Sequence, residues 1–242
     1  MSDIETNGCA NLLFHQDGRV DTAYLRSLAR QEVERSSLIR VAAEGSAAAA
    51  RALHVGFWPF VSEFEIAIDR HSLPRTPLRK KYGQRANKTF VWLASAIRQM
   101  KEEEGSHAAH WRKDAECLGV HDLSAPTLAG VRELIADAYS PDLPRFFSVL
   151  AGTEFIAEEL SSFLVSSAAY TGLFSRKRWM WGEVHLAPHD HGPSHLEIDI
   201  DLARAYGPDT MEALENVGTM VQETITLFGL AAAEVESLIQ SV

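Results

Sequence analysis

The chain has 242 residues, of which 46% are hydrophobic, and a formal net charge of −10. This acidic balance argues against general nucleic-acid binding, because phosphate contacts need a basic surface. No apolar run approaches the roughly 18–20 residues of a membrane span. The polar, acidic start (Ser2, Asp3, Glu5) predicts no signal or transit peptide. The two cysteines, Cys9 and Cys117, fit a reducing compartment, so we expect a cytoplasmic protein without a nucleic-acid or membrane partner.

Helical periodicity continues along almost the whole chain, interrupted by Pro and Gly. Residues 1–20 are expected to form an N-terminal tail or arm, and residues 21–242 a single all-helical domain. In chain order, the expected helices cover about 21–43, 46–70, 77–118, 124–139, 146–169, 178–186, 193–206 and the segment after 208. The sequence contains no alternating strand pattern of useful length and no repeat. We therefore predict an all-α bundle of seven or eight helices.

The first candidate metal-binding window is a run of glutamates followed by histidines in the helix expected over 77–118. Glu104 and His107 are three residues apart and therefore share a helix face, so both side chains can bind one metal ion. Glu103 forms the same kind of pair with His107 on an adjacent stripe, and His110 lies one turn further on. The alternative is an ordinary charged surface helix, which the run of glutamates also resembles.

The second window is the apolar helix expected over 146–169, which carries Glu154 and Glu158 four residues apart on one face. A carboxylate inside such a helix is costly unless it is paired or bound to a metal. Either glutamate could be the ligand. The alternative is that one is exposed and the other pairs with an Arg or Lys.

The third window contains four of the ten histidines. His195 and Asp199 are four residues apart in the first turns of an expected helix, a spacing that can bind one metal from one face. His185 ends the preceding short helix, and His189 and His191 fall in an expected loop. Imidazole and carboxylate together are ligands for iron, manganese or zinc. Glu-x-x-His units and paired glutamates inside a helical bundle are typical of di-iron sites.

Aromatic residues near these windows are candidates for a substrate pocket. Trp92, Trp111 and Trp181, with His110, could line it, although aromatic side chains at helical spacing are more often part of the core. No phosphate-binding glycine loop and no Gly-x-Ser-x-Gly nucleophile motif occurs in the sequence.

The order of these features resembles the TenA/PqqC group of the haem-oxygenase-like fold, over roughly residues 50–205. The resemblance also includes Leu150 to Glu159, in the apolar helix that carries the glutamates. The other motifs that carry it are Phe57-Trp58-Pro59-Phe60-Val61, Leu73-Pro74, Tyr82-Gly83-Gln84, Glu104-Gly105-Ser106-His107-Ala108-Ala109-His110-Trp111 and Leu118-Gly119.

Within that superfamily, the chain most resembles the haem-oxygenase-like di-iron oxidases. The resemblance places metal ligands at Glu104 and His107, at Glu154 or Glu158, and at His195 with Asp199. This sequence departs from the resemblance at Leu202, where many members have a further histidine. We expect His185 or a loop histidine to take the place of that ligand. Alternatively, the second metal binds weakly. The implied cofactor is two Fe(II) ions, with Mn as an alternative. The implied activity is dioxygen-dependent oxidation of a small amino-acid-derived or fatty-acid-like metabolite in a biosynthetic pathway.

Two other readings of the same residues stay open. A metal-free member of the fold, like PqqC, would use the histidines and glutamates as acid–base groups. A pure interaction protein would carry the histidines at its surface. The resemblance and the apolar stripe of the last expected helix also imply a homodimer.

Overall fold

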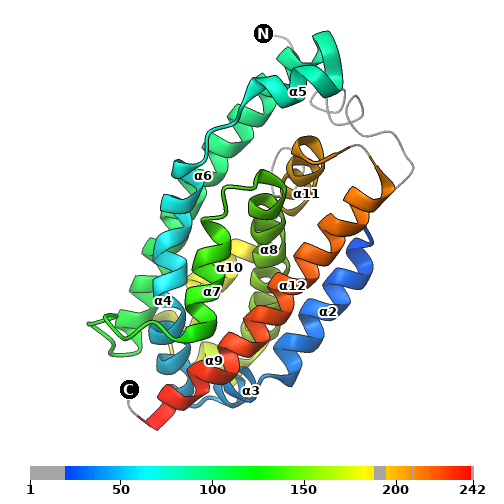
Figure 1. Cartoon of the computed structure of the whole chain (residues 1–242). Helices are drawn as coiled ribbons and strands as arrows, with labels where there is room; N and C mark the ends of the chain where they lie inside the picture. The colour runs from blue at the N-terminus through cyan, green and yellow to red at the C-terminus, as the bar shows by residue number, and fades with distance from the viewer. Residues whose placement is uncertain (1–19, 188–194, 209, 241–242) are drawn as a thin grey trace.

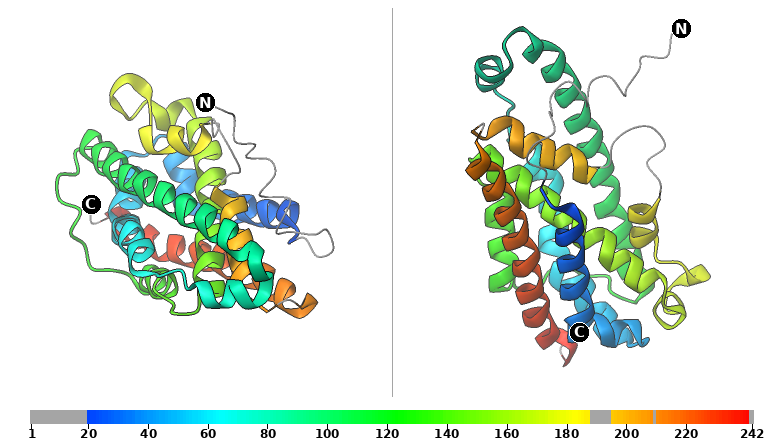
Figure 2. Two further views of the ribbon diagram at one scale, coloured as in Figure 1. Left: turned by 90° about the horizontal axis from the view of Figure 1, so that it is seen from above. Right: turned by 90° about the vertical axis from the view of Figure 1, so that its right-hand side faces the viewer.

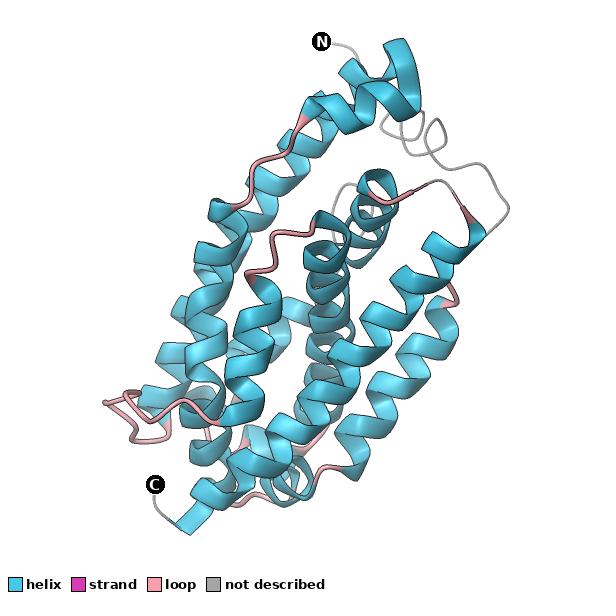
Figure 3. Cartoon of the chain, viewed as in Figure 1, coloured by secondary structure: helices cyan, strands magenta, loops and turns pink. Residues whose placement is uncertain are grey.

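The computed structural model describes residues 20–187, 195–208 and 210–240, so nearly all of the predicted tail lies outside the described residues. Within these ranges the chain forms helices and loops without a strand, which confirms the all-α prediction (Figure 3). The α-helices are α2 (Thr22–Arg35), α3 (Ser37–Ala43), α4 (Ala47–Arg70), α5 (Arg75–Tyr82), α6 (Ala86–Cys117), α7 (Ala129–Ala138), α8 (Leu143–Val165), α9 (Ala168–Thr171), α10 (Met180–Leu186), α11 (His195–Tyr206) and α12 (Met211–Glu236). Short 3-10 helices cover Gly83–Arg85, Ser175–Lys177 and Ser237–Gln240.

The described residues contain eleven α-helices rather than seven or eight. Some expected helices are divided into two: 21–43 forms α2 and α3, and 77–118 forms α5 and α6. The helix expected over 21–43 is divided at Ser36, whose hydroxyl accepts a hydrogen bond from the backbone N–H of Ile39 and begins α3. The helix expected from Ser124 begins only at Ala129. Ser124 instead forms a local turn, in which its backbone N–H and hydroxyl both donate to Asp122.

Helix α8 lies at the centre of the bundle (Figures 1 and 2). It packs against α2, α7, α10, α11 and α12, and most of its residues are buried. Helix α4 continues through Pro59 and packs against α6 and α7. Helix α6 continues through Gly105, and its first turns project with α5 beyond the other helices (Figure 1). The three windows of candidate ligands therefore lie on α6, on the central α8, and on the neighbouring α10 and α11.

The last helix, α12, contributes its apolar stripe to the core of the same chain. Val217, Val221, Ile225 and Phe228 are buried, and α12 contacts α8, α7 and α2. This stripe is thus not a free surface for a second subunit, and the homodimer stays a prediction that rests on the resemblance. Within the described ranges, no helix combines the length and the apolar character that crossing a membrane requires.

Candidate metal centre

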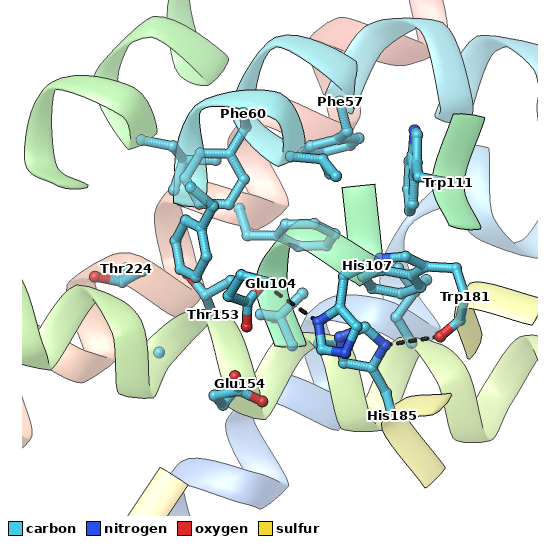
Figure 4. A pocket seen from close by; sticks show the side chains of 18 residues that line it. Phe57, Phe60, Glu104, His107, Trp111, Thr153, Glu154, Trp181, His185 and Thr224 are labelled. Carbon is cyan, nitrogen blue, oxygen red and sulfur yellow. Dashed lines mark hydrogen bonds and ion pairs between the residues drawn. The ribbon is translucent and has the colours of Figure 1, made fainter. Parts of the chain in front are cut away.

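Three residues from three different helices converge in the interior of the bundle. Glu104 on α6, Glu154 on α8 and His195 on α11 are all buried, and one potential ligand atom from each lies within 4.8 Å of the others. Figure 4 shows the two glutamates facing each other across this space. One residue from each of the three sequence windows is therefore present in one cluster.

The imidazole of His195 lies between two carboxylates. Its Nε2 is 2.6 Å from Oε2 of Glu103, and its Nδ1 is 3.6 Å from Oε1 of Glu154. Burial lowers the pKa of His195, but the contact with Glu154 and the charges of Glu103 and Glu104 outweigh it and raise this pKa to about 9. In the absence of a metal, the cluster therefore holds a proton on His195.

Asp199 follows His195 by one helical turn and is completely buried. Neither of its carboxylate oxygens has a hydrogen-bond partner among the described residues. Burial, followed by the nearby Glu154 and Glu104 carboxylates, raises the pKa of Asp199 well above its ordinary value. A buried carboxylate without a partner is costly, so this position is unfavourable for folding alone.

His107 and His185 lie beside the glutamates, with ring centroids 4.3 Å apart (Figure 4). Nδ1 of His107 is 3.3 Å from Oε2 of Glu104. Nδ1 of His185 is 2.7 Å from the carbonyl oxygen of Trp181, which only accepts, so Nδ1 donates and Nε2 of the neutral ring keeps its lone pair. Burial, assisted by His107, lowers the pKa of His185 to about 4. His185 is therefore neutral at pH 7, the form in which imidazole binds metals.

The two glutamates that the sequence left as alternatives have different surroundings. Glu154 lies in the cluster, whereas Oε2 of Glu158 is 2.5 Å from Nη1 of Arg26 on α2. The neighbouring Glu159 also binds Arg26 and Arg30. Glu158 therefore has a cationic partner on α2 and is not a member of the cluster that Glu104, Glu154 and His195 form.

A pocket extends from these residues into the bundle, and Trp111 and Trp181 both line it. His110 does not line this pocket, although its neighbour Trp111 does. The side chain of Trp92 lies outside the described residues, as do the loop histidines His189 and His191.

Two features of the centre were not apparent from the individual motifs. Glu103 was identified only as a partner for His107, yet its carboxylate contacts His195 on another helix. Leu202, which stands where the resembling oxidases have a further histidine, is fully buried and apolar. His185 on α10 lies beside His107, next to this cluster.

Comparison with known proteins supports the fold independently of these motifs. No family model matches the sequence, and no curated protein matches it. Among solved structures, the chain is similar to a TenA homologue from Pseudomonas syringae pv. tomato str. DC3000, with a TM-score of 0.66 and 16% sequence identity. The match covers 93% of this chain and 100% of the other. The chain therefore has the all-helical, haem-oxygenase-like fold of TenA homologues.

Proposed function

We propose that this protein is a non-haem iron enzyme that uses dioxygen to oxidise a small molecule held in the pocket beside the metal centre. The proposed ligands are Glu104, His107, Glu154, His195 and Asp199. His185 is proposed as the further ligand in place of the histidine that Leu202 replaces. This set would hold two Fe(II) ions or, alternatively, Mn(II).

The observation that carries the proposal is the unpartnered carboxylate of Asp199. A buried polar group left without a hydrogen-bond partner typically costs about 1–3 kcal/mol. A cation between Asp199 and the nearby glutamates would provide the missing partner. Three carboxylates and neutral imidazoles are also the donor types that suit iron and manganese.

Several residues have surroundings that would prepare them to bind a metal. The Trp181 carbonyl orients His185 so that Nε2 is the available nitrogen, as outer-sphere partners commonly do for metal-bound histidines. Glu103 would hold the His195 ring in place. The bound iron would supply dioxygen activation. Trp111, Trp181 and the phenylalanines of α4 would keep water away from the reacting substrate.

Anaerobic titration with ferrous iron, followed by calorimetry and elemental analysis, tests this proposal. We expect saturable binding with proton release, because His195 and Asp199 must lose protons to act as ligands. Exposure to air should then change the absorption spectrum. Wild-type protein that neither binds iron nor is stabilised by iron or manganese would contradict the proposal.

A metal-free, PqqC-like enzyme is the second candidate function. It is favoured by the ion pair between His195 and Glu103 at 2.6 Å, which gives the protonated imidazole a carboxylate partner without a metal. In that case Glu154, which lines the pocket, would be the acid–base group that meets the substrate, and His195 would lie behind it. Turnover that persists after exhaustive chelation would favour this candidate.

A further inference from the structure

The pocket beside the metal centre continues away from it as an apolar space between α4, α7, α8 and α12. Its walls there are aromatic and aliphatic side chains. They include Phe60, Phe64, Leu134, Ile156, Leu160 and Phe228. Figure 4 shows Phe57 and Phe60 above the two glutamates, and Thr224 on the opposite side of the glutamates from His107.

The polar groups of this apolar part are already engaged. Thr153 donates its hydroxyl proton to the carbonyl oxygen of Val149 at 2.9 Å, and Thr224 donates to that of Met220 at 3.1 Å. All the ionisable residues that line the pocket within the described chain belong to the metal centre. The part of the pocket beyond the metal centre therefore offers no charged partner to a bound molecule.

This distribution of polar groups disfavours any substrate that would place a charged group in the apolar part of the pocket. The charged side chain of an amino-acid substrate, placed among these phenylalanines and leucines, would lose its hydration without gaining a counter-ion. A hydrocarbon chain would instead gain the full benefit of transfer out of water. Any polar end of the molecule would have to lie at the glutamates and histidines.

We propose that the substrate carries an uncharged hydrocarbon portion that fills the space between α4, α7, α8 and α12, with its polar end at the metal centre. The assignment of the reacting end rests on the proposed function. The binding of the hydrocarbon portion does not depend on metal. It can therefore be tested separately in the metal-free protein.

The probes are straight-chain primary alcohols from 1-hexanol to 1-decanol, titrated calorimetrically into metal-free protein. A neutral head group avoids repulsion by Glu104 and Glu154. We expect one site, with affinity that rises about fourfold for each added methylene, which is about 0.8 kcal/mol converted at 1.36 kcal/mol per tenfold. The rise should stop at the chain length that fills the pocket, and binding should have a negative heat-capacity change.

A matched pair of variants locates the binding site. Ala157 on α8 lines the pocket, whereas Ser162 on the same helix is exposed. In Ala157→Met the longer side chain would occupy part of the space, so the affinity should stop rising at a shorter alcohol. Ser162→Met introduces the same side chain outside the pocket and should leave the series unchanged.

Three outcomes would overturn the inference: affinity that does not depend on chain length, an unchanged series in Ala157→Met, or tighter binding of L-lysine or L-arginine than of any alcohol. If the protein binds the alcohols but no iron, the substrate class stands and the proposed oxidase function fails. If it binds iron but none of the alcohols, the proposed oxidase function stands and the inferred substrate class fails.

Discussion

Replacement of Asp199 by asparagine separates a metal ligand from a structural side chain. Asparagine keeps the shape of the carboxylate but cannot carry its negative charge. Because the oxygens of Asp199 have no partner among the described residues, the substitution breaks no hydrogen bond of the metal-free protein. We therefore expect metal-free Asp199→Asn to be at least as stable as metal-free wild type, and to bind iron much more weakly.

Because metal binding is linked to folding, the loss of affinity for iron sets how much less iron stabilises the variant than the wild type. Loss of an outer-sphere partner of a metal ligand already weakens binding roughly 10- to 100-fold, so loss of a charged ligand should cost at least about 100-fold. At iron concentrations about 100 times the wild-type Kd, binding stabilises the wild type by about 2.7 kcal/mol. The same concentration roughly equals the Kd of the variant and stabilises it by only about 0.4 kcal/mol.

Thermal unfolding under anaerobic conditions measures the stability of the metal-free proteins when iron is omitted. The same experiment with ferrous iron measures how much iron stabilises each protein. For a chain of this length, about 1 kcal/mol shifts Tm by roughly 2–4 °C, so iron should raise the Tm of the wild type by about 5–11 °C and that of the variant by about 1–2 °C. Equal iron-induced shifts in both proteins would refute the assignment of Asp199 as a ligand. A large loss of stability in the metal-free variant would instead give Asp199 a structural role.

Four further predictions address other parts of the molecule. Glu154→Gln should abolish stabilisation by iron in thermal melts, whereas Glu158→Gln should retain it and lose at most about 1 kcal/mol from its partly exposed ion pair. Burial lowers the pKa of His54 to about 4, so the protonated unfolded state is favoured as the pH falls below about 6.5. Denaturant titrations should show that His54→Leu loses about 2 kcal/mol less stability than wild type between pH 7 and pH 5. Gly152→Ala should reduce the free energy of unfolding by about 1–3 kcal/mol, because its Cβ would lie 2.7 Å from Cβ of Thr224. Sedimentation at micromolar protein concentration should show a homodimer, and a monomer alone would contradict it.

The helical architecture could be predicted from the sequence because its signals are local. Apolar periodicity and the positions of Pro and Gly are properties of neighbouring residues, and they identified α4, α8, α11 and α12 to within a few residues. The division at Ser36 and the late start of α7 could not be predicted as well. Both depend on whether a serine caps a helix or forms a turn, and the same residue type does either.

The candidate centre was accessible to sequence reasoning only in part. Donor types at helical spacing identified Glu104, His195 and Asp199, but the spacing of Glu154 and Glu158 is the same for a ligand pair and for a surface pair. The difference between them depends on Arg26, which lies far away in the sequence and approaches Glu158 only when α2 packs against α8. Contacts between distant helices are not encoded in the periodicity of either helix.

Because α8 is central, one of its sides forms ion pairs with α2 and another side contributes to the candidate metal centre. Its α2 side presents Glu158 and Glu159 to arginines, and these ion pairs satisfy the carboxylates without a metal. Its interior side presents Glu154 to Glu104, His195 and the nearby Asp199, and no arginine or lysine of the described residues lines the pocket there. Folding favours buried polar groups that have partners, and the glutamates on the α2 side have them. On the interior side, the carboxyl oxygens of Asp199 have no hydrogen-bond partner among the described residues. A cationic ligand on the interior side therefore accounts for a set of buried carboxylates that packing alone leaves unexplained.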